Sequence, residues 1–234
     1  MDDIDANGLV ERVRELRAQG RTPKEIARAT GARPARISAI VRELGRDAYR
    51  AEAGTLVGAW VSRGWSTGLT VPADRPDWVD VPGRRGTEGL VGVLVARRDR
   101  PQRLSVCGYL VDVYCLGVKN VLGPKVLGDR ELPDFQRMFL GAMHDEPPLA
   151  APADLARQLV FGAVDYARSL GFQPHPDFAP AAGHLGDRGE TSAITFGRDG
   201  KPLYISGPHD DPRQVMDTLV RTVGAGNFDY VTHI

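Results

Sequence analysis

The chain has 234 residues, of which 30 are basic and 30 acidic, so its formal net charge at pH 7 is zero. Apolar residues make up 42% of the sequence, enough for a sizeable core, and no run of roughly 18 apolar residues is present to span a membrane. The acidic, polar start MDDIDANG argues against a secretory signal, and two cysteines that match no zinc spacing favour a cytoplasmic protein with free thiols.

Residues 8–20 (GLVERVRELRAQG) predict the first helix of the chain. Leu9, Val10, Val13 and Leu16 recur at helical spacing and form one apolar face. Gly20 then marks the end of this helix.

Residues 22–44 (TPKEIARATGARPARISAIVREL) predict two helices joined by a tight turn. Thr22 is a good N-cap, Pro23 suits the first helical position, and Glu25 is placed to close a capping box. Gly31 can adopt the left-handed backbone conformation that the turn needs. The second helix has apolar residues at helical spacing, namely Ile37, Ile40, Val41 and Leu44.

The spacing within these residues is specific. Counted from Pro23, the small residue Ala27 stands at position 5, Gly31 at position 9, and apolar residues at positions 4, 15 and 18. This arrangement resembles the helix-turn-helix of homeodomain-like and sigma-factor-like DNA readers, over about the first fifth of the chain. The resemblance implies that the helix at about residues 34–44 enters the DNA major groove. The alternative is a helical hairpin that only packs or dimerises.

The same resemblance implies which side chains face DNA. Arg33 and Arg42 are placed to read guanine edges or to hold phosphates, and Ser38 and Ala39 to contact base edges or a thymine methyl group. Arg28 and Arg36 are expected to contact the phosphates of the DNA backbone. The full expected set is Arg28, Arg33, Arg36, Ser38, Ala39 and Arg42.

Charge supports nucleic-acid binding by this segment. Residues 21–46 contain seven basic and two acidic residues, a net charge of +5. Because the whole chain is neutral, the rest of it is net acidic. Positive charge concentrated on one small unit is the footprint expected for phosphate contacts, although a merely solvated charged face has the same composition.

From residue 56 onward the pattern changes to short apolar runs separated by loops. Two β-type runs flank residues 62–64, and residues 90–97 and 104–116 predict a β-hairpin with a polar turn at 98–102. Helices are expected at residues 133–143 and within residues 151–172, the second ending at Gly171. Residues 192–208 predict a second hairpin around Asp199-Gly200, followed by a helix capped by Asp211 and a closing strand at 228–234. This order predicts an α+β domain with a mostly antiparallel sheet.

Residues 109–120 place Asp112, Cys115 and Lys119 in apolar surroundings. In a helix these three share one stripe, whereas in a strand Asp112 and Cys115 point to opposite faces. Such a group is either a site with shifted pKa values or a structural aspartate beside a thiol packed as a small hydrophobe. We favour the structural interpretation because no base at a fixed spacing accompanies the thiol.

Two histidines in a proline-rich loop are the next candidates. His175 and His184 lie near Asp177 and Asp187 and are residue types that bind divalent metals, but their spacing matches no metal motif. A loop held by side-chain hydrogen bonds is therefore expected, and no metal. The sequence also has no Walker loop, nucleophile elbow, dinucleotide-binding glycines or HExxH, so it predicts no cofactor and favours a protein that is not an enzyme.

The three tryptophans, Trp60, Trp65 and Trp78, lie close together in the sequence beside Arg63. If exposed, they would form a stacking platform for bases, but burial at the edge of a core is the more common role of tryptophan. Residues 91–98, 109–120, 166–178 and 194–208 together resemble an uncharacterised bacterial domain, over about half the chain. That resemblance carries no catalytic residues.

Together these features predict a cytoplasmic bacterial protein that binds double-stranded DNA, most simply a transcriptional regulator. Residues 1–46 are the expected reader, 47–55 a connector, and 56–234 a domain for ligand sensing, dimerisation or partner binding. One reader makes few contacts, so two half-sites and a homodimer are expected. Two alternatives remain open. One is an enzyme on nucleic acid that uses Asp112, Cys115, His175 and His184, and the other is a module that binds RNA through the tryptophans.

Overall fold

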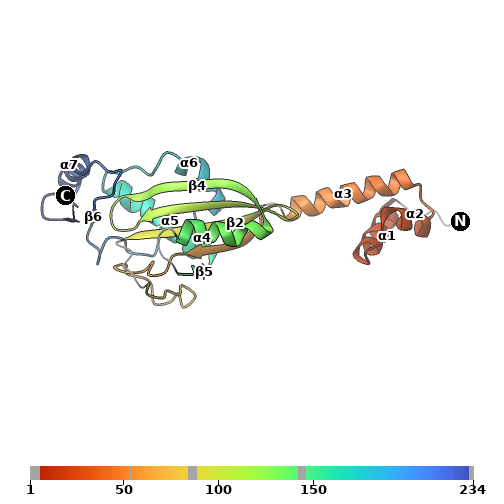
Figure 1. Cartoon of the computed structure of the whole chain (residues 1–234), viewed down its shortest axis with the longest axis horizontal. Helices are drawn as coiled ribbons and strands as arrows, with labels where there is room; N and C mark the ends of the chain where they lie inside the picture. Colours follow the sequence, from red (N-terminus) through yellow and green to blue (C-terminus); the bar gives the residue numbers. More distant parts are fainter. Residues whose placement is uncertain (1–5, 53, 84–88, 142–145, 232–234) are drawn as a thin grey trace. The chain divides into compact units, whose positions relative to one another are not determined.

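The computed structural model describes residues 6–52, 54–83, 89–141 and 146–231 (Figure 1). The chain divides into two compact units, Met1–Ala53 and Gly54–Ile234. The division lies within residues 47–55, where the sequence predicts a connector. Among the described helices, none is long and apolar enough to cross a membrane.

The first unit contains three helices, α1 (Ala6–Ala18), α2 (Pro23–Thr30) and α3 (Pro34–Glu52). The predicted start of α2 is confirmed, because the Thr22 hydroxyl accepts a hydrogen bond from the Glu25 N–H while the Glu25 carboxylate accepts one from the Thr22 N–H at 2.7 Å. Gly31 ends α2 with φ of 67°, the left-handed conformation predicted for the turn. Helix α3 continues beyond residue 44, through most of the expected connector, to Glu52.

The core of the first unit is a single aliphatic cluster. Its fully or nearly buried members come from all three helices, and they are Leu9, Val13, Leu16, Ile26, Ala27 and Ile37. Ala27 is buried where α2 and α3 pack, so the small residue at position 5 permits the close approach that the sequence pattern predicts. The residues on the inward side of α3 that are only partly buried are Ile40, Val41 and Leu44.

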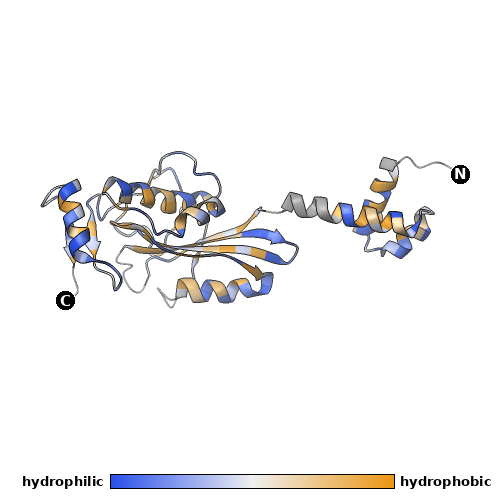
Figure 2. Ribbon diagram, turned by 90° about the horizontal axis from the view of Figure 1, so that it is seen from above, coloured by the Kyte–Doolittle hydropathy of each residue, from blue (hydrophilic) through white to orange (hydrophobic). Residues whose placement is uncertain are grey.

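The second unit is built on a five-stranded antiparallel sheet with strand order β4-β3-β2-β1-β5. The strands are β1 (Leu56–Val61), β2 (Leu90–Arg100), β3 (Arg103–Asp112), β4 (Gly117–Gly128) and β5 (Leu149–Ala151). Helices α4 (Leu132–Gly141) and α5 (Ala153–Ser169) cover opposite faces of this sheet (Figures 1 and 2). The α+β fold with a mostly antiparallel sheet is therefore confirmed.

Alternation along the strands separates the two cores. On β2, Leu94 and Ala96 point toward α4, while Val93 and Val95 belong to the larger core beneath α5. The short α6 (Phe178–Ala181) and the 3-10 turns η1 (Asp129–Glu131) and η2 (Ala182–Leu185) complete the sides of the sheet. Both faces of the central strands are therefore buried, as their nearly continuous apolar sequence requires.

The apolar run from Leu104 does not continue to residue 116 as one strand. It ends at Asp112, whose buried carboxylate accepts hydrogen bonds from the N–H groups of Tyr114, Cys115 and Leu116 at 2.9 to 3.2 Å. Gly117, with φ of 71°, then starts β4 in the reverse direction. The aspartate closes a turn inside a stretch that composition alone presents as a single strand.

The hairpin predicted at residues 192–208 is only partly correct. Asp199 and Gly200 have φ of 55° and 81° and form the expected tight turn, which is flanked by the bridge between Arg198 and Lys201. The next strand, β6 (Leu203–Ile205), instead pairs in parallel with β7 (Asp229–Val231), and α7 (Pro212–Thr222) connects the two. Pro202 has no N–H to extend an antiparallel ladder from the turn, which accounts for the change of partner.

We expect the turn glycine Gly31 to contribute to stability through its backbone conformation alone. A Cβ at this position would meet no atom within 4 Å, so Gly31→Ala introduces only the strain of a left-handed alanine, about 1 kcal/mol. Hydrogen exchange of the α2 and α3 amides in the full chain should show that loss. Gly31→Asn should lose less, because asparagine tolerates this conformation; equal protection in all three proteins would contradict the assignment.

Candidate nucleic-acid interface

The outward side of α3 is the strongest candidate surface in the chain. Ile37 is completely buried, which orients the helix so that Ser38, Ala39 and Arg42 all lie in solvent. Arg42 lies four residues after Ser38 and three after Ala39, so the three side chains share one stripe of the helix. The Arg42 Nε donates a hydrogen bond to the Ser38 carbonyl at 3.2 Å, so its guanidinium lies along this stripe.

The remaining predicted contact residues are also exposed. Arg28 lies in the last turn of α2, Arg33 directly precedes α3, and Arg36 lies in its first turn. Within the described part of the chain, none of these three has an acidic group within 4 Å or a side-chain hydrogen bond to another residue. Lys24, at the start of α2, is likewise exposed and unpaired there.

One of the two acidic residues of this segment is already engaged. The Glu25 carboxylate accepts hydrogen bonds from the N–H and the hydroxyl of Thr22, at 2.7 and 2.8 Å. The hydrogen bond from the Thr22 N–H, followed by that from its hydroxyl, lowers the pKa of Glu25. Among the described residues, Arg28, Arg33 and Arg36 therefore present exposed guanidinium groups with no acidic group within 4 Å, the state expected of side chains that bind phosphate.

The predicted cluster around Asp112 has a structural role. The Asp112 carboxylate accepts hydrogen bonds from three backbone N–H groups of the β3–β4 turn. Burial raises the pKa of this carboxyl group to about 6. Cys115 is buried beside it, and burial followed by the charge of Asp112 raises the pKa of this thiol. Cys107 is also buried, with a pKa raised to about 11, so neither thiol is activated as a nucleophile.

Lys119 pairs outside the predicted group. Its Nζ lies 2.8 Å from both carboxylate oxygens of Asp210, and Asp210 also accepts a hydrogen bond from the Gly207 N–H. This ion pair connects β4 to the loop before α7. For that loop the sequence predicts only the helix cap at Asp211, and no local signal links residues 91 positions apart.

The two candidate histidines have different partners. His175 Nδ1 lies 3.7 Å from Asp177 Oδ2 at the surface, whereas His184 Nε2 lies 3.2 Å from the Val95 carbonyl oxygen. Burial lowers the pKa of His184. Among the described residues, no three His, Cys, Asp or Glu side chains are grouped so that they could hold a metal ion. The candidate enzyme site of Asp112, Cys115, His175 and His184 is therefore not assembled as a metal centre.

The tryptophans do not form an exposed platform. Trp65 is 1% exposed and Trp78 6%, and the Trp65 indole donates a hydrogen bond to the Val79 carbonyl. Trp60 packs partly buried against the core beneath α4. The burial of these rings removes the stacking surface on which RNA binding through this region depends.

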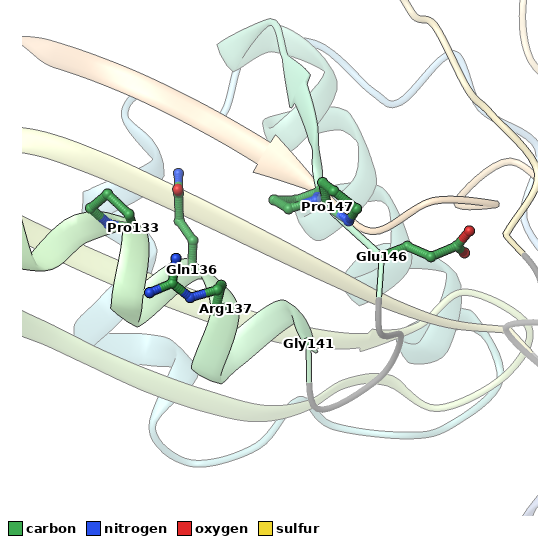
Figure 3. Close-up of a pocket in the computed structure, with 7 residues that line it drawn as sticks. Pro133, Gln136, Arg137, Gly141, Glu146 and Pro147 are labelled. Atoms are coloured by element: carbon green, nitrogen blue, oxygen red, sulfur yellow. The ribbon is translucent and has the colours of Figure 1, made fainter.

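A pocket in the second unit was not predicted from the sequence. It has a volume of about 520 Å³ and lies between α4 and the residues that precede β5 (Figure 3). Its lining includes Gln136, Arg137 and Glu146, together with three prolines. Among the described residues, the lining contains no cysteine, histidine or hydroxyl side chain that would serve as a nucleophile.

No protein-family model, curated protein or solved structure matches the chain. Function has to follow from the geometry and charge of the residues themselves.

The raised pKa of Asp112 predicts the sign of one pH effect on stability. The pKa of Asp112 is about 6 in the folded protein and 3.8 in its ordinary state. Protonation of Asp112 therefore stabilises the native state, fully below pH 3.8, and this stabilisation is lost as the pH rises through 6. The shift corresponds to a change of about 3 kcal/mol at most. Urea unfolding between pH 3.5 and 7 should show this decline in wild type.

Asp112→Asn is the matched variant, because its amide oxygen retains an acceptor for the turn. Between pH 4 and 6 the free energy of unfolding should fall less in this variant than in wild type, because the titration of Asp112 is absent. An identical pH profile in both proteins would show that burial does not control this carboxyl group.

Proposed function

We propose that this protein binds double-stranded DNA, as a transcriptional regulator, through the outward side of α3. The observation that carries the proposal is the arrangement of Arg33, Arg36 and Arg42 on or beside a helix whose opposite side is buried. Two guanidinium groups near the start of the helix and one further along it suit guanine edges and phosphates, and the small Ser38 and Ala39 leave room for base edges between them.

Both the helix geometry and the charge of the first unit support DNA binding. A capping box, a left-handed glycine and a small residue at the helix crossing are what a short turn between two packed helices requires. A helical hairpin used only for packing needs no row of unpaired cations on its exposed side. Phosphate would give those cations a close counterion, which no acidic group among the described residues supplies within 4 Å.

We assign the second unit to ligand sensing, dimerisation or contact with a protein partner. Its pocket of about 520 Å³ is of a size that suits small molecules. A homodimer would supply the second reader that recognition of two half-sites requires. Two buried free cysteines are compatible with the reducing cytoplasm in which such a regulator works.

The first test is the affinity of the full chain for a mixed-sequence DNA duplex across a KCl series, measured by fluorescence anisotropy. In Arg33→Ala/Arg36→Ala/Arg42→Ala we expect binding at least about tenfold weaker, with a salt slope smaller by about 2 to 3, since each lost phosphate contact removes about 0.9. Each substituted side chain is exposed, so the fold should be retained.

A variant with the same charge loss elsewhere provides the control. Arg168, Arg198 and Arg213 are exposed in the second unit, and within the described residues none makes an ion pair. Arg168→Ala/Arg198→Ala/Arg213→Ala should bind like wild type apart from a small uniform weakening. No binding by wild type at low salt, or equal weakening by both triple variants, would refute the proposed interface.

A further inference from the structure

The turn end of the β2–β3 hairpin carries a concentration of positive charge that neither core of the second unit uses. Residues 97–103 (RRDRPQR) contain four arginines and one aspartate, a net charge of +3. The second unit, residues 54–234, contains 19 basic and 21 acidic residues, a net charge of −2, so this segment is opposite in sign to its own unit. Figure 2 shows the long strands changing from apolar to hydrophilic residues toward one end of the sheet.

The hairpin register sets two of these arginines against each other. Pro101 and Gln102, with φ of 63° at Gln102, form the turn, and Arg100 and Arg103 are direct cross-strand partners. Like charges in directly opposed positions destabilise a sheet. Arg100 is 71% exposed, with Asp99 Oδ2 at 3.4 Å, and Arg103 is exposed with no acidic group within 4 Å among the described residues. Such a pair gains stability from a shared external anion.

A third cation lies beside the turn. The Asp129 N–H donates to the Gln102 carbonyl at 3.2 Å, which places η1 and its exposed Arg130 next to the hairpin end. The acidic neighbours are already engaged, since Asp129 pairs with Arg98 at 2.7 Å and Glu131 accepts the Gly128 N–H at 2.5 Å. Within the described part of the chain, Arg130 has no acidic partner. We call Arg100, Arg103 and Arg130 the arginine tip.

The arginine tip is anchored where the chain leaves α3. The Gly54 N–H donates to the Arg98 carbonyl at 2.7 Å, and Arg97 Nη1 donates to the Gly54 carbonyl at the same distance. Only residue 53 separates Gly54 from Glu52, the last residue of α3. Arg42 and Glu52 are ten residues apart in one helix, a rise of about 15 Å, which is less than one turn of duplex DNA. Covalent connectivity therefore keeps these cations near any duplex that α3 binds, whatever the orientation of the two units.

We propose that the arginine tip is a second phosphate-binding surface, which contacts the sugar–phosphate backbone of the same duplex beside the site bound by α3. The inference rests on the proposed function, because the tip has no independent means of selecting a site. Its contribution is electrostatic and independent of base sequence: each guanidinium that neutralises a phosphate releases counterions. Tethering to the first unit makes this second contact intramolecular once α3 has bound.

The test compares salt slopes of anisotropy titrations with a 30-base-pair mixed-sequence duplex, using the full chain. In Arg100→Ala/Arg103→Ala/Arg130→Ala we expect the slope to fall by about 2 to 3 relative to wild type, about 0.9 for each contact. Arg100→Lys/Arg103→Lys/Arg130→Lys keeps the charge and should retain the wild-type slope. Circular dichroism and thermal unfolding check that both variants fold like wild type.

The control is Arg168→Ala/Arg198→Ala/Arg213→Ala, which removes the same charge from other parts of the second unit. A slope that falls as much in this control as in the alanine tip variant would refute the inference, because net charge alone would then explain the effect. An unchanged slope in the alanine tip variant, with binding still weakened by Arg33→Ala/Arg36→Ala/Arg42→Ala, would refute the arginine tip but leave the proposed function intact. Absence of binding by wild type would refute both.

Discussion

Burial of Ile26 and Ile37 against α1 is the constraint on which the candidate interface depends. With these two side chains in the core, α3 has no freedom of rotation about its axis, and the side that bears Arg42 must remain in solvent. Gly31 makes the arrangement possible because its left-handed conformation reverses the chain within a few residues. A short aliphatic core thus controls where the positive charges of the first unit are presented.

In the second unit, the main requirement is that both faces of the five-stranded sheet are covered. Helices α4 and α5 bury the central strands, and the Asp112 turn and the Lys119–Asp210 ion pair hold the peripheral segments in place. The buried or half-buried polar side chains Asp112, Lys119 and Asp210 therefore stabilise the fold of this unit. The hairpin end bearing Arg100 and Arg103 is the exception, because these two cations oppose each other across the strands and Arg103 has no acidic group within 4 Å among the described residues.

Sequence reasoning succeeded where the signal is local and failed where the partner is distant. The capping box at Thr22, the turn at Gly31 and the spans of α4 and α5 follow from residues within one or two helical turns. The predicted end of β3 at residue 116 was wrong because a single aspartate, Asp112, closes a turn inside the apolar run. The partner of β6 was wrong because strand pairing across α7 depends on tertiary packing, and Pro202 is the only local hint.

The sequence by itself determined the α+β class, the three N-terminal helices and the charge of the first unit, because caps, spacing and composition are properties of neighbouring residues. Only the tertiary structure decided which side of α3 lies in solvent, that Trp65 and Trp78 are buried, that the histidines have separate partners, and that Arg130 lies beside the hairpin turn. Burial and long-range pairing depend on how distant segments fill shared space, and no local pattern encodes that outcome.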